Sequence, residues 1–193
     1  IGYDSRFLSE TFAAAAAQLA ARLGARVILA DRPCPTPAIS YAVASQKGAG
    51  GIVITSSHNP PEWNGVKFKT PEGSSSGPEL TREFEAAIPD HVKPLPPAAQ
   101  PVESFNPKSD YLSGLLAKVS LKNPPFSKRL HVVIDCMHGS GAGYLADALK
   151  SIGIACTEIH SNRDPLFGGH APEPLPQFSS ELTHAIALTR QKD

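Results

Sequence analysis

The feature that most constrains the fold is an alternation of short β-branched runs with stretches of helix length. Five such segments follow one another in the first sixty residues: a strand at 1–3, a helix at 9–23, a strand at 26–30, a helix at 38–46 and a strand at 52–55. Ser9 is placed to cap the first helix, and Gly24 is placed to end it. Because parallel strands need helical crossovers, the alternation predicts an α/β fold with a mostly parallel sheet.

The second half of the chain repeats this alternation. We expect helices and strands in the order helix 111–119, strand 130–136, helix 144–152, strand 154–159 and helix 179–191. Between the halves, residues 89–101 carry five prolines and few bulky apolar side chains, which is typical of the approach to a domain boundary. The sequence therefore predicts two consecutive α/β domains of related topology, 1–107 and 108–193, with mostly parallel mixed sheets sandwiched by helices.

Charge and hydropathy exclude two classes of partner. The chain has 18 Lys plus Arg and 18 Asp plus Glu, so its formal net charge is zero, whereas binding a nucleic-acid backbone needs a surplus of cations. No apolar run approaches the roughly 18 residues that cross a bilayer. We expect a soluble protein of the cytoplasm that binds neither nucleic acid nor membrane.

The most unusual segment is the loop 55–65, Thr-Ser-Ser-His-Asn-Pro-Pro-Glu-Trp-Asn-Gly, which we call the serine loop. It follows a buried strand, and in open parallel sheets ligands bind beyond the carboxyl ends of the strands. A plain structural interpretation stays open, in which Ser56 and Ser57 cap a turn and His58 is solvated. A serine hydrolase is disfavoured, because no G-x-S-x-G elbow surrounds these serines.

Two further clusters could bind phosphate. Lys67 and Lys69 alternate with apolar residues on a strand, so with Arg6 they form either a phosphate-binding rim or a solvated edge. The turn 139–143, Gly-Ser-Gly-Ala-Gly, could present backbone N–H groups to a phosphate, but a tight strand-to-helix turn explains it equally well.

The remaining polar residues predict structure rather than chemistry. Asp135 precedes the glycine turn and is expected to anchor it. Three histidines, His138, His160 and His170, show no i, i+4 pairing, so we expect no zinc site. The cysteines Cys34, Cys136 and Cys156 are too few for a disulfide scaffold, and the two in strand-like runs are expected to be buried thiols.

A family resemblance rests on three segments. The run Thr55 to Pro60, followed by Asn64-Gly65-Val66-Lys67, resembles the active-site serine loop of the α-D-phosphohexomutases, the family of phosphoglucomutase and phosphomannomutase. That loop reads Thr-Ala-Ser-His-Asn-Pro and then Asn-Gly-x-Lys, so Ser56 is the departure. Gly2 to Arg6 is similar to the family's Gly-x-Asp-x-Arg segment, and 162–174 is similar to its Pro-rich loop in the second domain.

The resemblance implies an enzyme of four domains, of which this chain would hold the first two. Domain 1 would be truncated at its N-terminal side, and domain 2 would end before the Asp-Gly-Asp-x-Asp-Arg loop that binds the metal. The missing C-terminal domains of the same polypeptide are then expected partners. We expect the fragment alone to be inactive.

The resemblance also implies a mechanism. Ser57 would carry a phosphoryl group, and a hexose 1,6-bisphosphate would be the intermediate between hexose 1-phosphate and hexose 6-phosphate. His58, Lys67 and Arg6 would act beside it as catalytic residues, and Arg6, His58, Asn59 and Lys67 would bind the substrate and its phosphate. Mg²⁺ would bind Ser57 through its phosphate, together with three aspartates beyond the fragment.

The sugar is expected to be glucose, with mannose as the other possibility. The segment 61–69 and the Asp-Pro-Leu-Phe-Gly-Gly stretch at 164–169 look closer to phosphoglucomutase/phosphomannomutase members than to the phosphoglucosamine branch. The alternative from another class is a module that binds phosphosugars without chemistry. It would keep Arg6 and Lys67 but would exchange no phosphate on Ser57.

Overall fold

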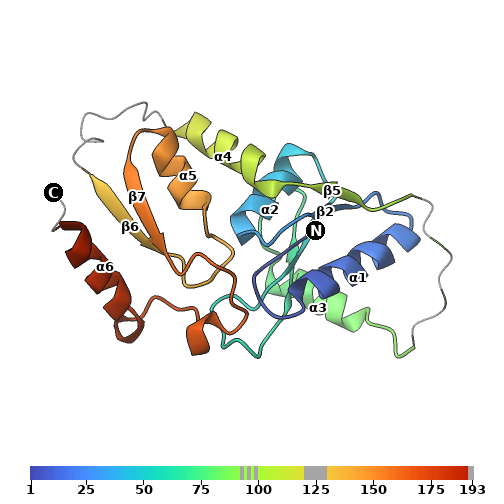
Figure 1. The fold of residues 1–193 in the computed structure, drawn as a ribbon. Coiled ribbons are helices and arrows are strands. Elements are labelled where there is room, and N and C mark those ends of the chain that lie inside the picture. Colours follow the sequence, from blue (N-terminus) through green and yellow to red (C-terminus); the bar gives the residue numbers. More distant parts are fainter. Residues whose placement is uncertain (92–93, 95–96, 98–99, 120–129, 191–193) are drawn as a thin grey trace. The chain divides into compact units, whose positions relative to one another are not determined.

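The computed structural model describes residues 1–91, 94, 97, 100–119 and 130–190 (Figure 1). These residues divide into two compact units, and each is described by itself. Unit 1 comprises 1–4, 8–56 and 64–107, and unit 2 comprises 5–7, 57–63 and 108–193. Two short segments from the first half of the chain, including most of the serine loop, therefore cluster with the second half. The domain limits 1–107 and 108–193 stay a prediction.

Unit 1 is built on five short strands. They are β1 (Gly2–Tyr3), β2 (Ile28–Ala30), β3 (Gly51–Ile54), β4 (Val66–Lys69) and β5 (Glu103–Phe105). β1 pairs parallel with β3, β3 pairs antiparallel with β4, and β2 pairs parallel with β5. Backbone hydrogen bonds from Ile1 to Ile28 and from Ala30 to Ile1 join the two groups, at 2.7 and 2.9 Å. The resulting order is β5-β2-β1-β3-β4, and the predicted mostly parallel sheet is confirmed.

The helices of unit 1 are α1 (Ser9–Arg22), α2 (Thr36–Ser45) and α3 (Pro78–Ala86). α1 buries every fourth residue along one stripe, Ala13, Ala17 and Ala21, and these small side chains let it lie close to the strands. The crossovers β1-α1-β2 and β2-α2-β3 run in opposite directions across the sheet. Since such crossovers are right-handed, they place α1 and α2 on opposite faces.

Details of unit 1 correct the sequence analysis in two places. Ser9 does not cap α1, because Leu8 is the residue before the helix and Ser9 donates its hydroxyl to Asp4. β5 was not predicted, since three residues after a Pro-rich stretch carry no periodic signal. Gly24 does end α1 as predicted, with a left-handed φ of 92° and its N–H donated to Ala21.

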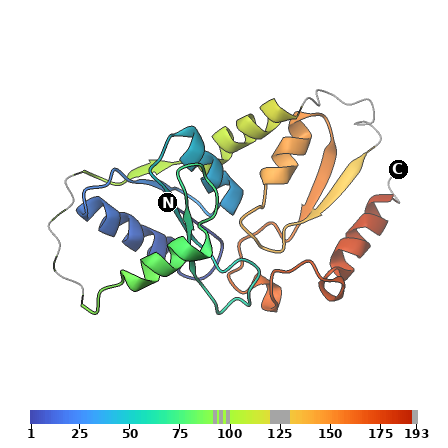
Figure 2. The same ribbon diagram turned by 180° about the vertical axis from the view of Figure 1, so that it is seen from behind.

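Unit 2 contains a parallel strand pair between helices. Its elements are α4 (Pro107–Lys118), β6 (His131–Asp135), α5 (Tyr144–Ser151), β7 (Ala155–Ile159), the 3₁₀ turns η2 (Phe167–Gly169) and η3 (Pro176–Phe178), and α6 (Ser180–Arg190). β6 and β7 lie side by side between α5 and α6 in both ribbon views (Figures 1 and 2). Residue 191, the predicted end of the last helix, lies outside the described residues. No helix in the described part of the chain is long and apolar enough to span a bilayer.

Gly73 provides a test of packing in unit 1. Its φ is +83°, and a Cβ placed there would collide with the carbonyl oxygen of Ser40. Gly24 has a similar φ of +92°, but a Cβ there would meet no atom within 4 Å. We expect Gly24→Ala to cost about 1–2 kcal/mol of unfolding free energy, the cost of a left-handed residue. Gly73→Ala should cost about 1–3 kcal/mol more, because the main chain of Ser40 must also move.

The measurement is urea unfolding followed by far-UV circular dichroism, with Gly24→Ala as the matched control. Equal losses of unfolding free energy in the two variants would contradict the close approach of the Gly73 and Ser40 main chains.

Candidate active site

The serine loop is wrapped around the buried side chain of Arg6. Arg6 is 0% exposed, and within unit 2 its two terminal nitrogens donate to four carbonyl oxygens of the loop. Nη1 reaches the carbonyls of Pro60 at 2.7 Å and Trp63 at 3.0 Å. Nη2 reaches those of Ser57 at 2.9 Å and Asn59 at 2.7 Å. A charged fork that satisfies four carbonyls at once fixes the path of the loop.

The base of the loop is held inside unit 1 by a chain of side-chain hydrogen bonds. Ser9 Oγ donates to Asp4 Oδ1 at 2.8 Å and accepts from Asn64 Nδ2 at 2.9 Å. Asn64 Oδ1 then accepts the N–H of Gly65 at 2.9 Å. A Cβ on Gly65 would lie 3.0 Å from the carbonyl oxygen of Thr55, so this position favours glycine. The Asn-Gly pair seen in the sequence therefore closes the loop.

Ser57 stands on this loop in a strained backbone conformation. It follows β3 by three residues, and its φ is +60°, in the left-handed region that costs a side-chain-bearing residue about 1–2 kcal/mol. Its side chain is exposed, and its Oγ lies 3.4 Å from Nδ1 of His58. Asn59 is exposed as well. Strain of this kind persists where surrounding contacts over-determine the backbone, and it is enriched at functional sites.

The predicted site residues fall into two groups. The first group, Arg6, Ser57, His58 and Asn59, belongs to unit 2. Lys67 lies exposed on β4 in unit 1. The neighbouring Lys69 is buried and donates to Ser75 at 2.9 Å, and its pKa is lowered by burial and then by the charge of Lys67. Lys69 thus serves a contact within unit 1.

The loop-holding role of Arg6 was missed by sequence reasoning. We predicted a fixed cation for a phosphoryl group, and that contact stays a prediction. The structure adds that all of its terminal nitrogens are engaged with the loop carbonyls. The signal available in the sequence was an arginine three residues after a very short strand, which says nothing about its burial.

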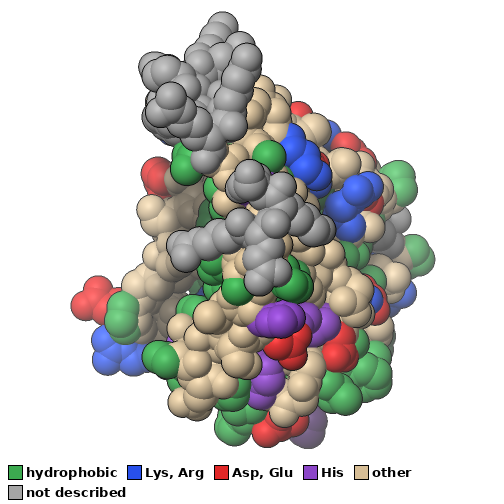
Figure 3. All heavy atoms as spheres, turned by 60° about the vertical axis from the view of Figure 1, so that its left-hand side comes forward, with side chains coloured by type: hydrophobic (Ala, Val, Ile, Leu, Met, Phe, Trp, Pro, Cys, Tyr) green, Lys and Arg blue, Asp and Glu red, His purple; other side chains and the backbone are tan. Residues whose placement is uncertain are grey.

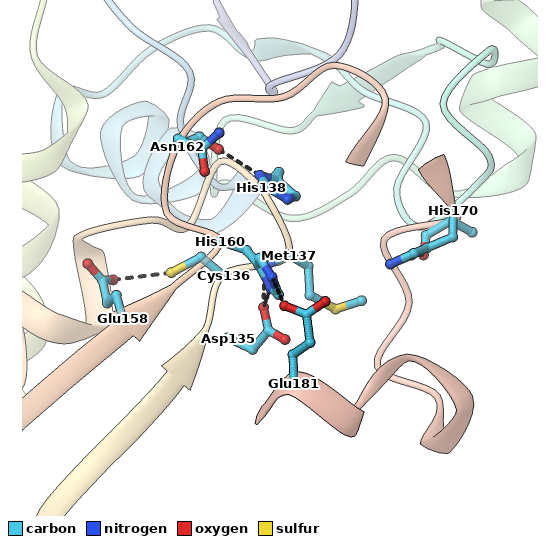
Figure 4. A network of polar contacts seen from close by, with 10 residues as sticks. Asp135, Cys136, Met137, His138, Glu158, His160, Asn162, His170 and Glu181 are labelled. Atoms are coloured by element: carbon cyan, nitrogen blue, oxygen red, sulfur yellow. Dashed lines mark hydrogen bonds and ion pairs between the residues drawn. The ribbon is translucent and has the colours of Figure 1, made fainter. Parts of the chain in front are cut away.

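A second polar cluster lies in unit 2 around a cavity of about 230 Å³ (Figure 4). His160 bridges two carboxylates, with Nδ1 2.8 Å from Asp135 and Nε2 2.9 Å from Glu181. The ring of His138 packs 5.0 Å from that of His160, and His170 lines the same cavity. Histidine and acidic side chains also gather at the surface in the space-filling view (Figure 3). Because these histidines are far apart in the sequence, their spacing did not predict that they lie around one cavity.

Asp135 holds His160 and the start of the turn after β6, and its anchoring of the glycine turn 139–143 stays a prediction. Its Oδ1 accepts the N–H of Met137 at 2.9 Å in addition to the contact with His160. The hydrogen bond that His160 makes to Asp135, and then the one to Glu181, raise the pKa of His160, while burial opposes them. Within the described ranges, no group of three or more His, Cys, Asp or Glu side chains could hold a metal ion.

The three cysteines are free thiols. Cys34 is buried, and burial raises its pKa to about 11. Cys136 and Cys156, predicted to be buried, are only partly so, because β6 and β7 form a narrow two-stranded pair. Burial, together with the Glu158 carboxylate that accepts the thiol hydrogen bond, raises the pKa of Cys136 to about 12. Neither Cys34 nor Cys136 is thus a ready nucleophile.

Comparison with known proteins gives consistent matches over nearly the whole chain. Family models described as phosphoglucomutase/phosphomannomutase α/β/α domain I and domain II match residues 1–93 and 109–193. A probable phosphoglucosamine mutase of Methanothermobacter thermautotrophicus is 30% identical over 193 residues, covering 98% of this chain and 41% of that protein. A phosphoglucosamine/phosphogalactosamine mutase of Sulfurisphaera tokodaii is 32% identical over 160 residues, covering 79% of this chain and 34% of that protein.

A solved structure agrees with these matches. The crystal structure of a proposed phosphomannomutase from Thermus thermophilus is 36% identical and superimposes with a TM-score of 0.85. The match covers 96% of this chain and 42% of the chain in that structure. The chain thus spans about two fifths of the length of the first of the curated relatives above and of this solved structure.

His160 generates a prediction about pH. Its pKa is raised in the folded state, so the charged imidazole stabilises the fold fully below its ordinary pKa of about 6.5. That stabilisation is lost as the pH rises through the raised value. We expect the melting temperature of the wild type to fall relative to that of His160→Gln as the pH rises above about 6.5, measured by circular dichroism.

The control is His184→Gln, which changes an exposed histidine on α6. It should keep the pH dependence of the wild type. A wild type and a His160→Gln variant with parallel pH profiles would contradict the bridge between Asp135 and Glu181.

Proposed function

This chain belongs to the phosphoglucomutase/phosphomannomutase family, and we propose that the protein containing it interconverts hexose 1-phosphate and hexose 6-phosphate through a phosphoserine at Ser57. The observation that carries the proposal is the exposed Ser57 hydroxyl on a loop whose main chain is held at four points by buried Arg6. The imidazole of His58 lies beside that hydroxyl. Phosphoryl transfer depends mainly on positioning and charge stabilisation, which such a loop supports.

In the proposed reaction, a free hydroxyl of the hexose phosphate attacks the phosphorus of phosphorylated Ser57. A bond between the sugar oxygen and phosphorus forms, and the bond from phosphorus to Ser57 Oγ breaks. The hydroxyl gives its proton to a base, and Oγ takes one up. The product is a hexose 1,6-bisphosphate, and its other phosphoryl group then returns to Ser57 by the same step in reverse. Ser57 is phosphorylated again at the end of the cycle.

The chain's own residues have definite parts in this scheme. His58, whose Nδ1 lies 3.4 Å from Ser57 Oγ, would give the leaving oxygen its proton. Arg6 fixes the loop and contributes a positive charge beneath it. Lys67 and Asn59 would contact the sugar phosphate, and a lysine there would balance the charge of the phosphoryl group.

Mg²⁺ enters the proposal only through the family resemblance. The ion would neutralise charge on the phosphoryl group, and its three aspartate ligands would lie beyond this chain. Ser57 is the member of that set that we assign here, and no group of three or more candidate ligands occurs among the described residues. The described residues therefore do not make a Mg²⁺ site by themselves, and no step above passes through the ion.

Between the two sugars of the family name, glucose is proposed first, with mannose as the other possibility. Glucosamine is the second candidate for the sugar, because relatives matching this chain are named phosphoglucosamine mutase. The proposal extends to further domains of the same polypeptide as partners, since the chain spans 41% of its relative from M. thermautotrophicus. We also propose a cytoplasmic location, and little or no turnover from these 193 residues alone.

The choice of sugar is tested on the whole protein by comparing kcat/KM for the 1-phosphates of glucose, mannose and glucosamine. We expect glucose 1-phosphate to have the highest value, with mannose 1-phosphate next. A higher value for glucosamine 1-phosphate would overturn the glucose assignment and favour the second candidate.

Ser57→Ala tests the reaction itself. Incubation of the whole protein with labelled glucose 1,6-bisphosphate should label the wild type and leave Ser57→Ala unlabelled, because the acceptor oxygen is gone. Mutase turnover should fall by at least about a thousandfold. Labelling is read by intact-mass spectrometry and scintillation counting.

The matched control is Ser56→Ala, which changes the neighbouring hydroxyl and creates the residue usual in the family's loop. It should label and turn over within a few-fold of the wild type. A Ser57→Ala variant with full turnover would exclude the phosphoserine mechanism, and an unlabelled but tightly binding wild type would favour a phosphosugar-binding module.

A further inference from the structure

The guanidinium of Arg6 lies over an aromatic ring in addition to its hydrogen bonds with the serine loop. Within unit 2, the Phe167 ring packs over it, with the ring centroid 5.1 Å from Cζ. Phe167 is 3% exposed and Arg6 is 0% exposed, so this contact is shielded from water. A cation over an aromatic face contributes most when it is desolvated. The ring therefore supports the guanidinium that donates to the carbonyls of the serine loop.

Arg163 holds the main chain of the same segment. Its Nε donates to the carbonyl of Ser5 at 3.1 Å, and its Nη2 donates to the carbonyl of Arg6 at 3.1 Å. The segment 163–167 thus contacts Arg6 in two places. Arg163 binds the backbone of Arg6, and Phe167 packs against its side chain. A side chain restrained at both ends has few alternative rotamers.

The turn that presents Phe167 is itself fixed. Phe167 has a φ of +53°, and Gly168 and Gly169 follow with φ of 72° and 87°. The Asp164 carboxylate accepts the N–H of Leu166 at 2.9 Å and that of Gly168 at 3.0 Å, and these bonds lower its pKa. A left-handed phenylalanine is an unusual conformation that the surrounding contacts must enforce. These contacts thus fix the turn that holds the Phe167 ring against Arg6.

We propose that Arg163 and Phe167 are positioning residues for Ser57, which act by holding the Arg6 guanidinium in the one orientation that fits the carbonyls of the serine loop. The proposal rests on the proposed function, in which Ser57 accepts and donates the phosphoryl group. Small displacements of a reacting atom can cost about 100-fold in rate, so a loosened loop lowers the transfer rate rather than sugar binding.

The test uses the whole protein and measures the single-turnover rate of phosphoryl transfer to Ser57 from labelled glucose 1,6-bisphosphate. Phe167→Leu keeps an apolar side chain but removes the aromatic face, and Arg163→Met removes the two donors. Each should lower the transfer rate on the order of tenfold, with little change in the bisphosphate concentration that gives half the maximal rate. Phe167→Tyr keeps the face and should restore the wild-type rate.

The matched control is Leu166→Ala, at a 63% exposed side chain in the same turn. It should stay within about twofold of the wild type. Amide hydrogen exchange of residues 57–63 gives a second readout that does not depend on chemistry. Exchange should be faster in Phe167→Leu and Arg163→Met than in Leu166→Ala.

The two possible failures are separable. A wild type that accepts no phosphoryl group on Ser57 refutes the proposed function, while the exchange data still decide whether these residues hold the loop. The positioning proposal is overturned by a different result, in which the wild type is labelled normally and both Phe167→Leu and Arg163→Met fold. In that result, the two variants transfer the phosphoryl group as fast as the wild type, and their amide hydrogen exchange is unchanged. If Phe167→Leu does not fold, Arg163→Met, at an exposed side chain, decides the outcome.

Discussion

The buried guanidinium of Arg6 is the interaction on which the candidate site depends. A charge removed from water needs strong compensating contacts, and here four carbonyl oxygens and an aromatic face provide them. Because the loop carbonyls converge inward on one cation, the loop is held from its inner side. The Ser57 side chain is left exposed on the outside. The same contacts that satisfy the arginine therefore make the serine available.

This arrangement suits phosphoryl transfer for a physical reason. The serine needs no strong base, since the chemistry depends on holding phosphorus, nucleophile and leaving oxygen in line. A left-handed backbone at Ser57 is costly by itself, and the hydrogen bonds of the loop hold it there. A fixed loop loses little further entropy when the phosphoryl group arrives. Unit 2 supplies the remaining restraint through Arg163 and Phe167.

Sequence reasoning was accurate for local patterns and poor for long-range contacts. The alternation of strands and helices followed from periodicity, and the serine loop followed from its prolines and its place after a buried strand. The burial of Arg6 did not follow, since a charged residue after a strand is ordinarily solvated. Serine is a residue type that favours helix caps, but the Ser9 hydroxyl donates to Asp4 and accepts from Asn64 instead. These contacts become visible only when residues far apart in sequence are brought together.

The most direct test of the account maps where phosphate goes in the whole protein and how fast it arrives. Peptides of the wild type and of Arg6→Lys are sequenced by mass spectrometry at intervals after addition of glucose 1,6-bisphosphate. We expect phosphate on Ser57 in the wild type, and transfer slower by about 100-fold in Arg6→Lys, because an ammonium cannot reproduce the planar fork. Phosphate on a residue other than Ser57, or equal rates in the two proteins, would contradict it.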